Sequence, residues 1–513
     1  MAVSSDRPST TPDDAAHPVP DELSVASSVA GLAPPTAPSV EDVASTLFGR
    51  GMLYVAVLAA QMVSSVLVSP ILAHLLPPRE FGELASAIAV HQVLVVLAVA
   101  GIDQALVQIR ATSDDDRPAR ALVLLALVLA CALTAVAALT VPWWGHELGF
   151  APSSPILVTV IGWTVPASAT LVVSALLLSQ DRLGAFSLLN ILSAVGGQFS
   201  GLVILIGGGY RTANAYALGG LGSLALVLVL GLVLVRPRWS RRIGPDVARR
   251  ALALGIPLMV SGLAIYVLNA GDRLVVQRLL GPEEAGRYQI AYTVGNVAVL
   301  LLSMVSAAWA PRIAAIADED RRWALIGHSR DGLIALMAPA ITGITLAAPL
   351  VLTLVAPESY RPGALLPVVF LVALAGFPVL AGSGTGRALV TLERTGPLAW
   401  SAVIAAVVNV GLNILLVPHL DLSGAALATL VAFTIQAVLH RAWLPAGIVW
   451  PRTPLAVLLP PTLAVAVCAA TLLLPQSTEW DLGRFALAVV CLPWFLHRLR
   501  IAQGKPGLLR RPT

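Results

Sequence analysis

The chain has 513 residues, of which 57% are hydrophobic and only 12% charged, with a formal net charge of +4. An ordinary globular domain carries about 25% charged residues. These charges are too few to cover a water-exposed surface, so the composition excludes a soluble protein. The small positive excess is better explained by basic loops between membrane spans than by nucleic-acid binding.

Residues 1–45 are rich in Ser, Pro, Ala and Asp, which predicts a disordered cytoplasmic tail. No basic stretch precedes an apolar core there, so a cleaved secretory signal is not expected. About fourteen apolar runs follow, each long enough to cross a hydrocarbon core of about 30 Å. They lie near residues 50–73, 84–108, 120–142, 155–178, 185–208, 213–235, 253–279, 287–311, 331–355, 364–389, 397–418, 422–444, 454–475 and 483–499. Their hydrophobicity is continuous rather than alternating, which favours helices over the strands of a barrel.

An internal repeat divides these spans. The stretch Leu75–Gly82 recurs as Leu279–Gly286, and Asp181–Gly184 resembles Glu393–Gly396. Each repeat holds six spans, so both copies enter the membrane with the same orientation. The predicted domains are an N-terminal lobe at 46–235, a basic cytoplasmic linker at 236–251, a C-terminal lobe at 252–445, two additional helices at 446–500 and a basic cytoplasmic tail at 501–513.

The arginines indicate the orientation of the spans. They concentrate in alternate loops, such as Arg110–Arg120, Arg236–Arg250 and Arg312–Arg330, and are isolated in the opposite loops. Positive loops stay on the cytoplasmic side. We therefore expect both termini to be cytoplasmic.

Ionisable and polar side chains inside apolar spans are the candidate site. Asp272 and Arg273 lie in the seventh span, where a charge costs about 2.5–3.5 kcal/mol on insertion scales. This cost predicts a cavity or lobe interface, although both side chains could instead reach the outer membrane surface. Other residues predicted to line the cavity are Asn269, Tyr292, Asn296, Gln61, His91 and Gln92, and the predicted cytoplasmic mouth contains Asp103, Arg387 and Arg394.

Three of these residues have simpler alternatives. His91 could titrate in a proton-coupled cycle, or it could be a hydrogen-bonded contact between helices. Arg387 and Arg394 could meet an anionic substrate, or they could be cytoplasmic anchors of their spans. The sequence leaves these alternatives open.

The stretches Asp272–Leu274, Leu279–Tyr288 and Ala100–Val107, with Phe81-Gly82, resemble signatures of the polysaccharide and oligosaccharide flippases. This family belongs to the superfamily that also contains multidrug exporters and the lipid II flippase. The resemblance covers roughly residues 45–450. It implies two six-helix lobes facing each other, with the first, second, seventh and eighth spans around a central cavity.

The resemblance implies a function that breaks no covalent bond: transfer of polyprenyl-diphosphate-linked oligosaccharide from the cytoplasmic to the outer leaflet. We accordingly expect no catalytic residue, cofactor or metal. The expected partners are the lipid-linked glycan, membrane lipid, a coupling ion (H⁺ or Na⁺) and glycan-pathway proteins such as a polymerase, in a bacterial cytoplasmic membrane. The alternatives are a cation-coupled multidrug exporter, a lipid II flippase and, least favoured because the external loops are short, a membrane glycosyltransferase or ligase.

Overall fold

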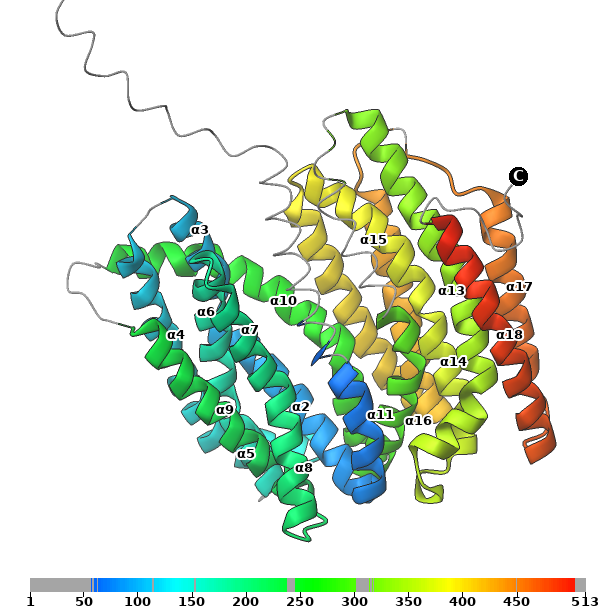
Figure 1. Cartoon of the computed structure of the whole chain (residues 1–513), viewed down its shortest axis with the longest axis horizontal. Coiled ribbons are helices and arrows are strands. Elements are labelled where there is room, and N and C mark those ends of the chain that lie inside the picture. The colour runs from blue at the N-terminus through cyan, green and yellow to red at the C-terminus, as the bar shows by residue number, and fades with distance from the viewer. Residues whose placement is uncertain are drawn as a thin grey trace, which may run out of the picture. The chain divides into compact units, whose positions relative to one another are not determined.

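The computed structural model describes residues 57–502, with gaps at 58–59, 62, 113–114, 152–153, 238–244, 301–312, 314–315, 317 and 449. The predicted N-terminal tail, the middle of the predicted linker and nearly all of the predicted C-terminal tail lie outside these residues. Every described element belongs to one compact unit, Leu53–Thr513. All of the regular elements in the described part are helical (Figure 1).

The first group of helices follows the first six predicted spans. An apolar helix at Val63–Leu75 forms the first span. The next five spans are α2 (Pro78–Val99) with α3 (Ile102–Thr112), α4 (Asp116–Trp144), α5 (Pro155–Gly162) with α6 (Thr164–Ser179), α7 (Leu183–Ile191) with α8 (Gly197–Gly207), and α9 (Ala213–Val235). α6 packs against α2, α4 and α9, and α8 packs against α9.

The second group contains the remaining spans. It consists of α10 (Pro245–Leu280), α11 (Pro282–Gly295), α13 (Glu319–Val355), α14 (Leu366–Leu374) with α15 (Gly376–Thr391), α16 (Thr395–Ala442), α17 (Leu455–Thr471) and α18 (Thr478–Ala502). α16 reverses direction at Asp421, where φ is 49° and ψ is −137°. Because of this reversal, Asn409 donates a hydrogen bond to Thr429 across the two halves of α16. α17 and α18 pack against α13.

The number of spans agrees with the sequence. In the part of the chain that the structure describes, ten helices are long and apolar enough to cross a membrane, and two shorter apolar helices lie at Val63–Leu75 and Leu455–Thr471. The reversal in α16 adds one span, and α11 begins another whose continuation lies outside the described residues. The predicted all-helical membrane fold of about fourteen spans is confirmed.

Several helices begin earlier than their apolar runs predict. α4 begins at Asp116, after Asp115 caps it by accepting a hydrogen bond from the backbone N–H of Arg117. Asp318 caps α13 in the same way. Such caps satisfy the N–H groups that a helix leaves free at its start. An apolar run therefore marks only the part that crosses lipid, and the helix continues into the polar flank.

The repeat is visible in matching backbone turns. Asp181 and Glu393 have left-handed backbones, with φ of 60° and 58°. The next residues, Arg182 and Arg394, each donate a backbone N–H to the carbonyl five residues back, both at 2.9 Å. This 6→1 hydrogen bond is a Schellman-type helix end. The two copies thus end the same span with the same geometry.

The two repeats contact each other where α2 and α11 begin. A Cβ on Gly82 would lie 1.8 Å from the carbonyl oxygen of Pro282, and a Cβ on Gly286 would lie 2.1 Å from that of Pro78. These residues form two repeat-equivalent pairs, so the contact is reciprocal, as across a two-fold axis. Only glycine permits two helix backbones to approach this closely.

We expect Gly82→Ala to destabilise the protein by about 1–3 kcal/mol, because the added methyl forces the α2 and α11 backbones apart. Thermal unfolding of the protein in detergent would measure the change. Gly222→Ala in α9 is the matched control, because a Cβ there meets nothing within 4 Å. Equal melting temperatures for the two variants would contradict the close contact.

Candidate substrate cavity between the two repeats

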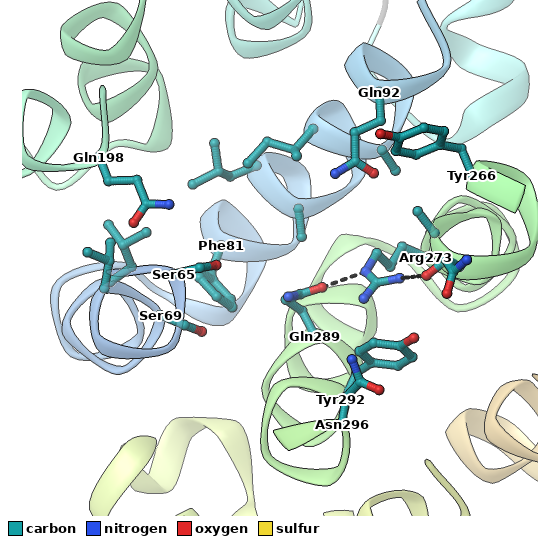
Figure 2. A pocket seen from close by; sticks show the side chains of 18 of the residues that line it. Ser65, Ser69, Phe81, Gln92, Gln198, Tyr266, Arg273, Gln289, Tyr292 and Asn296 are labelled. Carbon is teal, nitrogen blue, oxygen red and sulfur yellow. Dashed lines mark hydrogen bonds between the residues drawn. The ribbon is translucent and has the colours of Figure 1, made fainter. Parts of the chain in front are cut away.

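A cavity of about 440 Å³ lies between the two repeats. Its lining combines amides, hydroxyls, tyrosines and one arginine, as Figure 2 shows. The polar and aromatic lining residues are Ser65, Ser69, Phe81, Gln92, Gln198, Tyr216, Tyr266, Asn269, Arg273, Gln289, Tyr292 and Asn296. Within the described part of the chain, Arg273 is the charged residue of this lining.

Repeat-equivalent positions face each other across the cavity. The pairs that line it, 204 residues apart in each case, are Ser65 with Asn269, Ser69 with Arg273, Ala85 with Gln289, Ile88 with Tyr292, and Gln92 with Asn296. The cavity is therefore symmetric in backbone and asymmetric in chemistry. The C-terminal repeat supplies the larger and more polar side chain at most of these positions.

Arg273 on α10 is held by four neighbours. Its Nε donates to Oε1 of Gln289 at 2.5 Å, and its Nη1 donates to the Asn269 carbonyl at 2.7 Å and to Oδ1 of Asp272 at 3.0 Å. The guanidinium carbon lies 4.3 Å from the ring centre of Tyr292, a cation–π contact. None of these hydrogen bonds uses the second terminal nitrogen, Nη2.

Asp272 supplies the negative charge that neutralises Arg273. Its side chain is fully buried, and its Oδ2 accepts a hydrogen bond of 2.6 Å from the Tyr288 hydroxyl on α11. A buried carboxylate is tolerated when a charge partner and hydrogen bonds satisfy its oxygens. Asp272 therefore supports Arg273 without lining the cavity itself.

Five of the residues predicted for the cavity lie on its wall: Arg273, Asn269, Tyr292, Asn296 and Gln92. The other three predicted cavity residues, Asp272, Gln61 and His91, are not part of that wall. Nδ1 of His91 lies 3.3 Å from the Thr164 hydroxyl, and its ring meets the Trp163 ring edge-on. This placement matches the helix-contact alternative for His91, and its proton-coupling role stays a prediction.

The residues predicted for the cytoplasmic mouth do not line the cavity either. Asp103 accepts a hydrogen bond from Gln104 at the start of α3. Arg387 lies near the end of α15, and Arg394 is exposed in the turn that follows. The role of these three residues in admitting a substrate stays a prediction.

Sequence reasoning did not identify Gln289 and Gln198. Gln289 lies three residues before Tyr292 and seven before Asn296, so it shares their helical face. This spacing is the sequence signal from which Gln289 could have been predicted. Gln198 gives no such signal, because a local irregularity of its helix turns it into the cavity.

Among the described residues, no three His, Cys, Asp or Glu side chains come together in a way that could hold a metal ion. The cavity offers hydrogen-bond donors and acceptors, aromatic faces and one guanidinium. These groups bind anionic and hydroxyl-rich ligands without reacting with them.

These features define the class: a multi-pass, all-helical membrane protein whose two parallel repeats enclose a polar cavity. The chain also matches the family model described as polysaccharide biosynthesis protein over residues 71–364, more than half of its length. The chain belongs to this family, as its sequence signatures indicated.

Three known proteins illustrate the relationship. The probable low-salt glycan biosynthesis flippase Agl15 of Haloferax volcanii is 24% identical over 54% of this chain, and the match spans only 58% of Agl15. The succinoglycan biosynthesis transport protein ExoT of Rhizobium meliloti is 26% identical over 69% of this chain and 74% of its own. The lipid II flippase MurJ, in an inward closed conformation, shares the fold with a TM-score of 0.68 at 12% identity, covering 89% of this chain and all of MurJ.

We expect Asp272→Ala and Arg273→Ala each to destabilise the protein by about 3–5 kcal/mol, because each leaves one buried charge without its partner. The double variant should lose less than the sum of the two. Unfolding free energies of all four proteins in detergent would give the coupling energy. Strict additivity would show that the pair does not act as a unit.

Proposed function

We propose that this protein is a flippase that moves polyprenyl-diphosphate-linked oligosaccharide from the cytoplasmic to the outer leaflet by alternating access. The observation that carries the proposal is Arg273, whose guanidinium is held at the wall of a sugar-compatible cavity by Gln289, Asn269 and Asp272. The descriptions of Agl15 as a flippase and of ExoT as a transport protein support a transporter over an enzyme.

The cavity chemistry suits such a head group. A guanidinium matches the geometry of phosphoryl oxygens, while amides and tyrosines bind sugar hydroxyls and sugar faces. A volume of about 440 Å³ equals the space of about fifteen waters. The cavity therefore has room for the diphosphate and the first sugars, and a longer glycan would extend beyond it.

An apolar groove beside the cavity favours a lipid-linked substrate over a water-soluble drug. Its volume is about 280 Å³, and it runs between the Val63–Leu75 helix, α11 and α13. The residues that line it include Val66, Pro70 and Thr293. Each of these residues either is adjacent in sequence to a residue of the polar cavity or forms a hydrogen bond with one. We propose that this groove holds the start of the polyprenyl chain.

A set of contacts joins the two repeats near the place where α2 and α11 begin. The Tyr360 hydroxyl donates to the Leu76 carbonyl at 3.0 Å, and Gln277 donates to the Leu148 carbonyl at 3.3 Å. Burial raises the pKa of Tyr360, so its hydroxyl remains a donor at physiological pH. The arginine-poor loops lie at this end, so we propose that it is the outer gate.

The orientation of the chain follows from the same proposal. Both termini are cytoplasmic, and the membrane is the bacterial cytoplasmic membrane. The coupling ion, H⁺ or Na⁺, and the association with a glycan polymerase are further parts of the proposal. Because the lipid II flippase MurJ has the same fold, transport of lipid II remains an alternative, and the test below includes it as an outcome.

We expect Arg273→Ala to abolish transfer of a fluorescent polyprenyl-diphosphate N-acetylglucosamine across proteoliposomes, because the head group loses its phosphate ligand. Protection of the fluorophore from external dithionite measures the transfer. Arg79→Ala is the control for removing an arginine, since that side chain is 71% exposed and pairs with Glu83 at i,i+4. Because Arg273→Ala is also expected to be less stable, size-exclusion elution of the reconstituted variant has to match that of the wild type. Normal transfer by Arg273→Ala would remove the basis of the proposal, and transfer of lipid II alone would favour the alternative.

We expect Tyr360→Phe to open the outer gate. The lost hydrogen bond is worth about 0.5–1.5 kcal/mol, which raises the open population about two- to tenfold. Labelling of Ser69→Cys by an impermeant thiol reagent added outside measures this, after replacement of Cys131, Cys468 and Cys491. Unchanged labelling would place the gate elsewhere.

A further inference from the structure

The fifth span is interrupted by a π-helical turn at Leu192–Gly196, between α7 and α8. Single π-turns are uncommon and occur frequently at functional sites. An additional residue in a helix rotates everything after it by about 100°, the angle of one residue. The turn therefore changes which face of α8 points toward the cavity.

Each half of this span is fixed separately by its neighbours. In α7, Asn190 donates to the Ser174 hydroxyl at 3.1 Å, and Leu189 is fully buried. In α8, Ser200 donates to the Gly219 carbonyl at 2.9 Å, and Gly201 packs directly against the Tyr216 ring. The π-turn allows both halves to point the correct face at their neighbours. In a continuous α-helix, one of the two sets of contacts would be rotated away from its partners.

The consequence is the position of Gln198, in the first turn after the π-turn. Its Oε1 accepts a hydrogen bond of 2.8 Å from the Ser64 hydroxyl on the first helix. An amide whose oxygen faces one neighbour presents its NH₂ in the other direction. Figure 2 shows this NH₂ directed into the cavity, and among the described residues no protein acceptor bonds to it.

We infer that Gln198 recognises the sugar of the transported lipid by donating a hydrogen bond from Nε2 to a hydroxyl or acetamido oxygen, and that the π-turn and Ser64 position it. This inference rests on the proposed flippase function. Gln198 and Arg273 reach into the cavity from opposite repeats. One head group can therefore place its phosphate at Arg273 and its sugar at Gln198.

The chemistry of the two walls supports this division. The guanidinium of Arg273 carries a full positive charge and suits an anion. Gln198 is a neutral donor, and its neighbours on that wall include the hydroxyls of Ser65 and Ser69. A neutral donor binds a phosphate more weakly than a guanidinium binds it. Neutral donors instead match the uncharged acceptors of a sugar ring. A site built to hydrogen-bond a ligand oxygen discriminates strongly against a ligand that lacks it.

The test measures the affinity of the protein in nanodiscs for two kinds of ligand. The probes are a short-chain polyprenyl diphosphate without sugar and the same lipid carrying glucose, galactose or N-acetylglucosamine. We expect Gln198→Met, which keeps the side-chain length and removes the donor, to weaken the preferred glycosylated probe about tenfold. Affinity for the sugar-free lipid should stay unchanged, which also shows that the variant is folded. Arg273→Lys should weaken both kinds of probe.

Two further variants complete the design. Ser64→Ala should reduce the ratio between glycosylated and sugar-free affinities, because it frees the amide to rotate. Gln476→Met, in an exposed loop, is the control for the substitution itself. Equal loss for both kinds of probe in Gln198→Met, or no loss, would overturn the role of Gln198 alone. A wild-type protein that binds neither kind of probe would overturn the flippase proposal, and one that gains nothing from any of the sugars would overturn only this inference.

Discussion

The site depends on keeping one guanidinium inside a membrane span. Arg273 can be there because Asp272 supplies a countercharge on the adjacent residue, and Tyr288 in turn bonds that carboxylate from α11. The pair has no net charge, so the desolvation cost is that of a dipole rather than of an isolated ion. The same contacts join α10 to α11.

The repeat explains how such a site arises in a symmetric framework. Duplication gives two equivalent sets of helices, and their backbones meet across the Gly82 and Gly286 contact. Side chains at equivalent positions have then diverged: Ser69 faces Arg273, and Val68 occupies the position of Asp272. Symmetry thus provides the matched backbone contact, and the asymmetric side chains give the cavity its chemistry; in the proposed flippase cycle they serve as the hinge and the head-group site.

The sequence predicted the fold well because membrane spans depend mainly on the length and hydrophobicity of each run. It also located Arg273, Tyr292 and Asn296, since polar residues inside such runs are costly and stand out. It could not place His91, because a polar residue facing a neighbouring helix of its own lobe gives the same pattern as one facing a cavity. The sequence could not predict that Gln198 lines the cavity, for a different reason. A π-turn rotates the residues after it about the helix axis, whereas a prediction from periodicity assumes a regular helix throughout.

The contact between the two repeats where α2 and α11 begin is the proposed outer gate. The approach of α2 to α11 is made by glycine backbones. Among the described residues, the interactions beside it include two neutral hydrogen bonds, an exposed ion pair between Arg278 and Glu147 at 3.4 Å, and a buried apolar cluster in which the Phe81 and Tyr360 rings meet edge-on. Such hydrogen bonds are worth about 1 kcal/mol each, and an exposed ion pair about 0–1 kcal/mol. The buried apolar side chains that pack between the repeats add to the cost of opening. In the proposed transport cycle, a ligand opens this contact only if it binds the open state better by at least the whole cost of separating the two repeats.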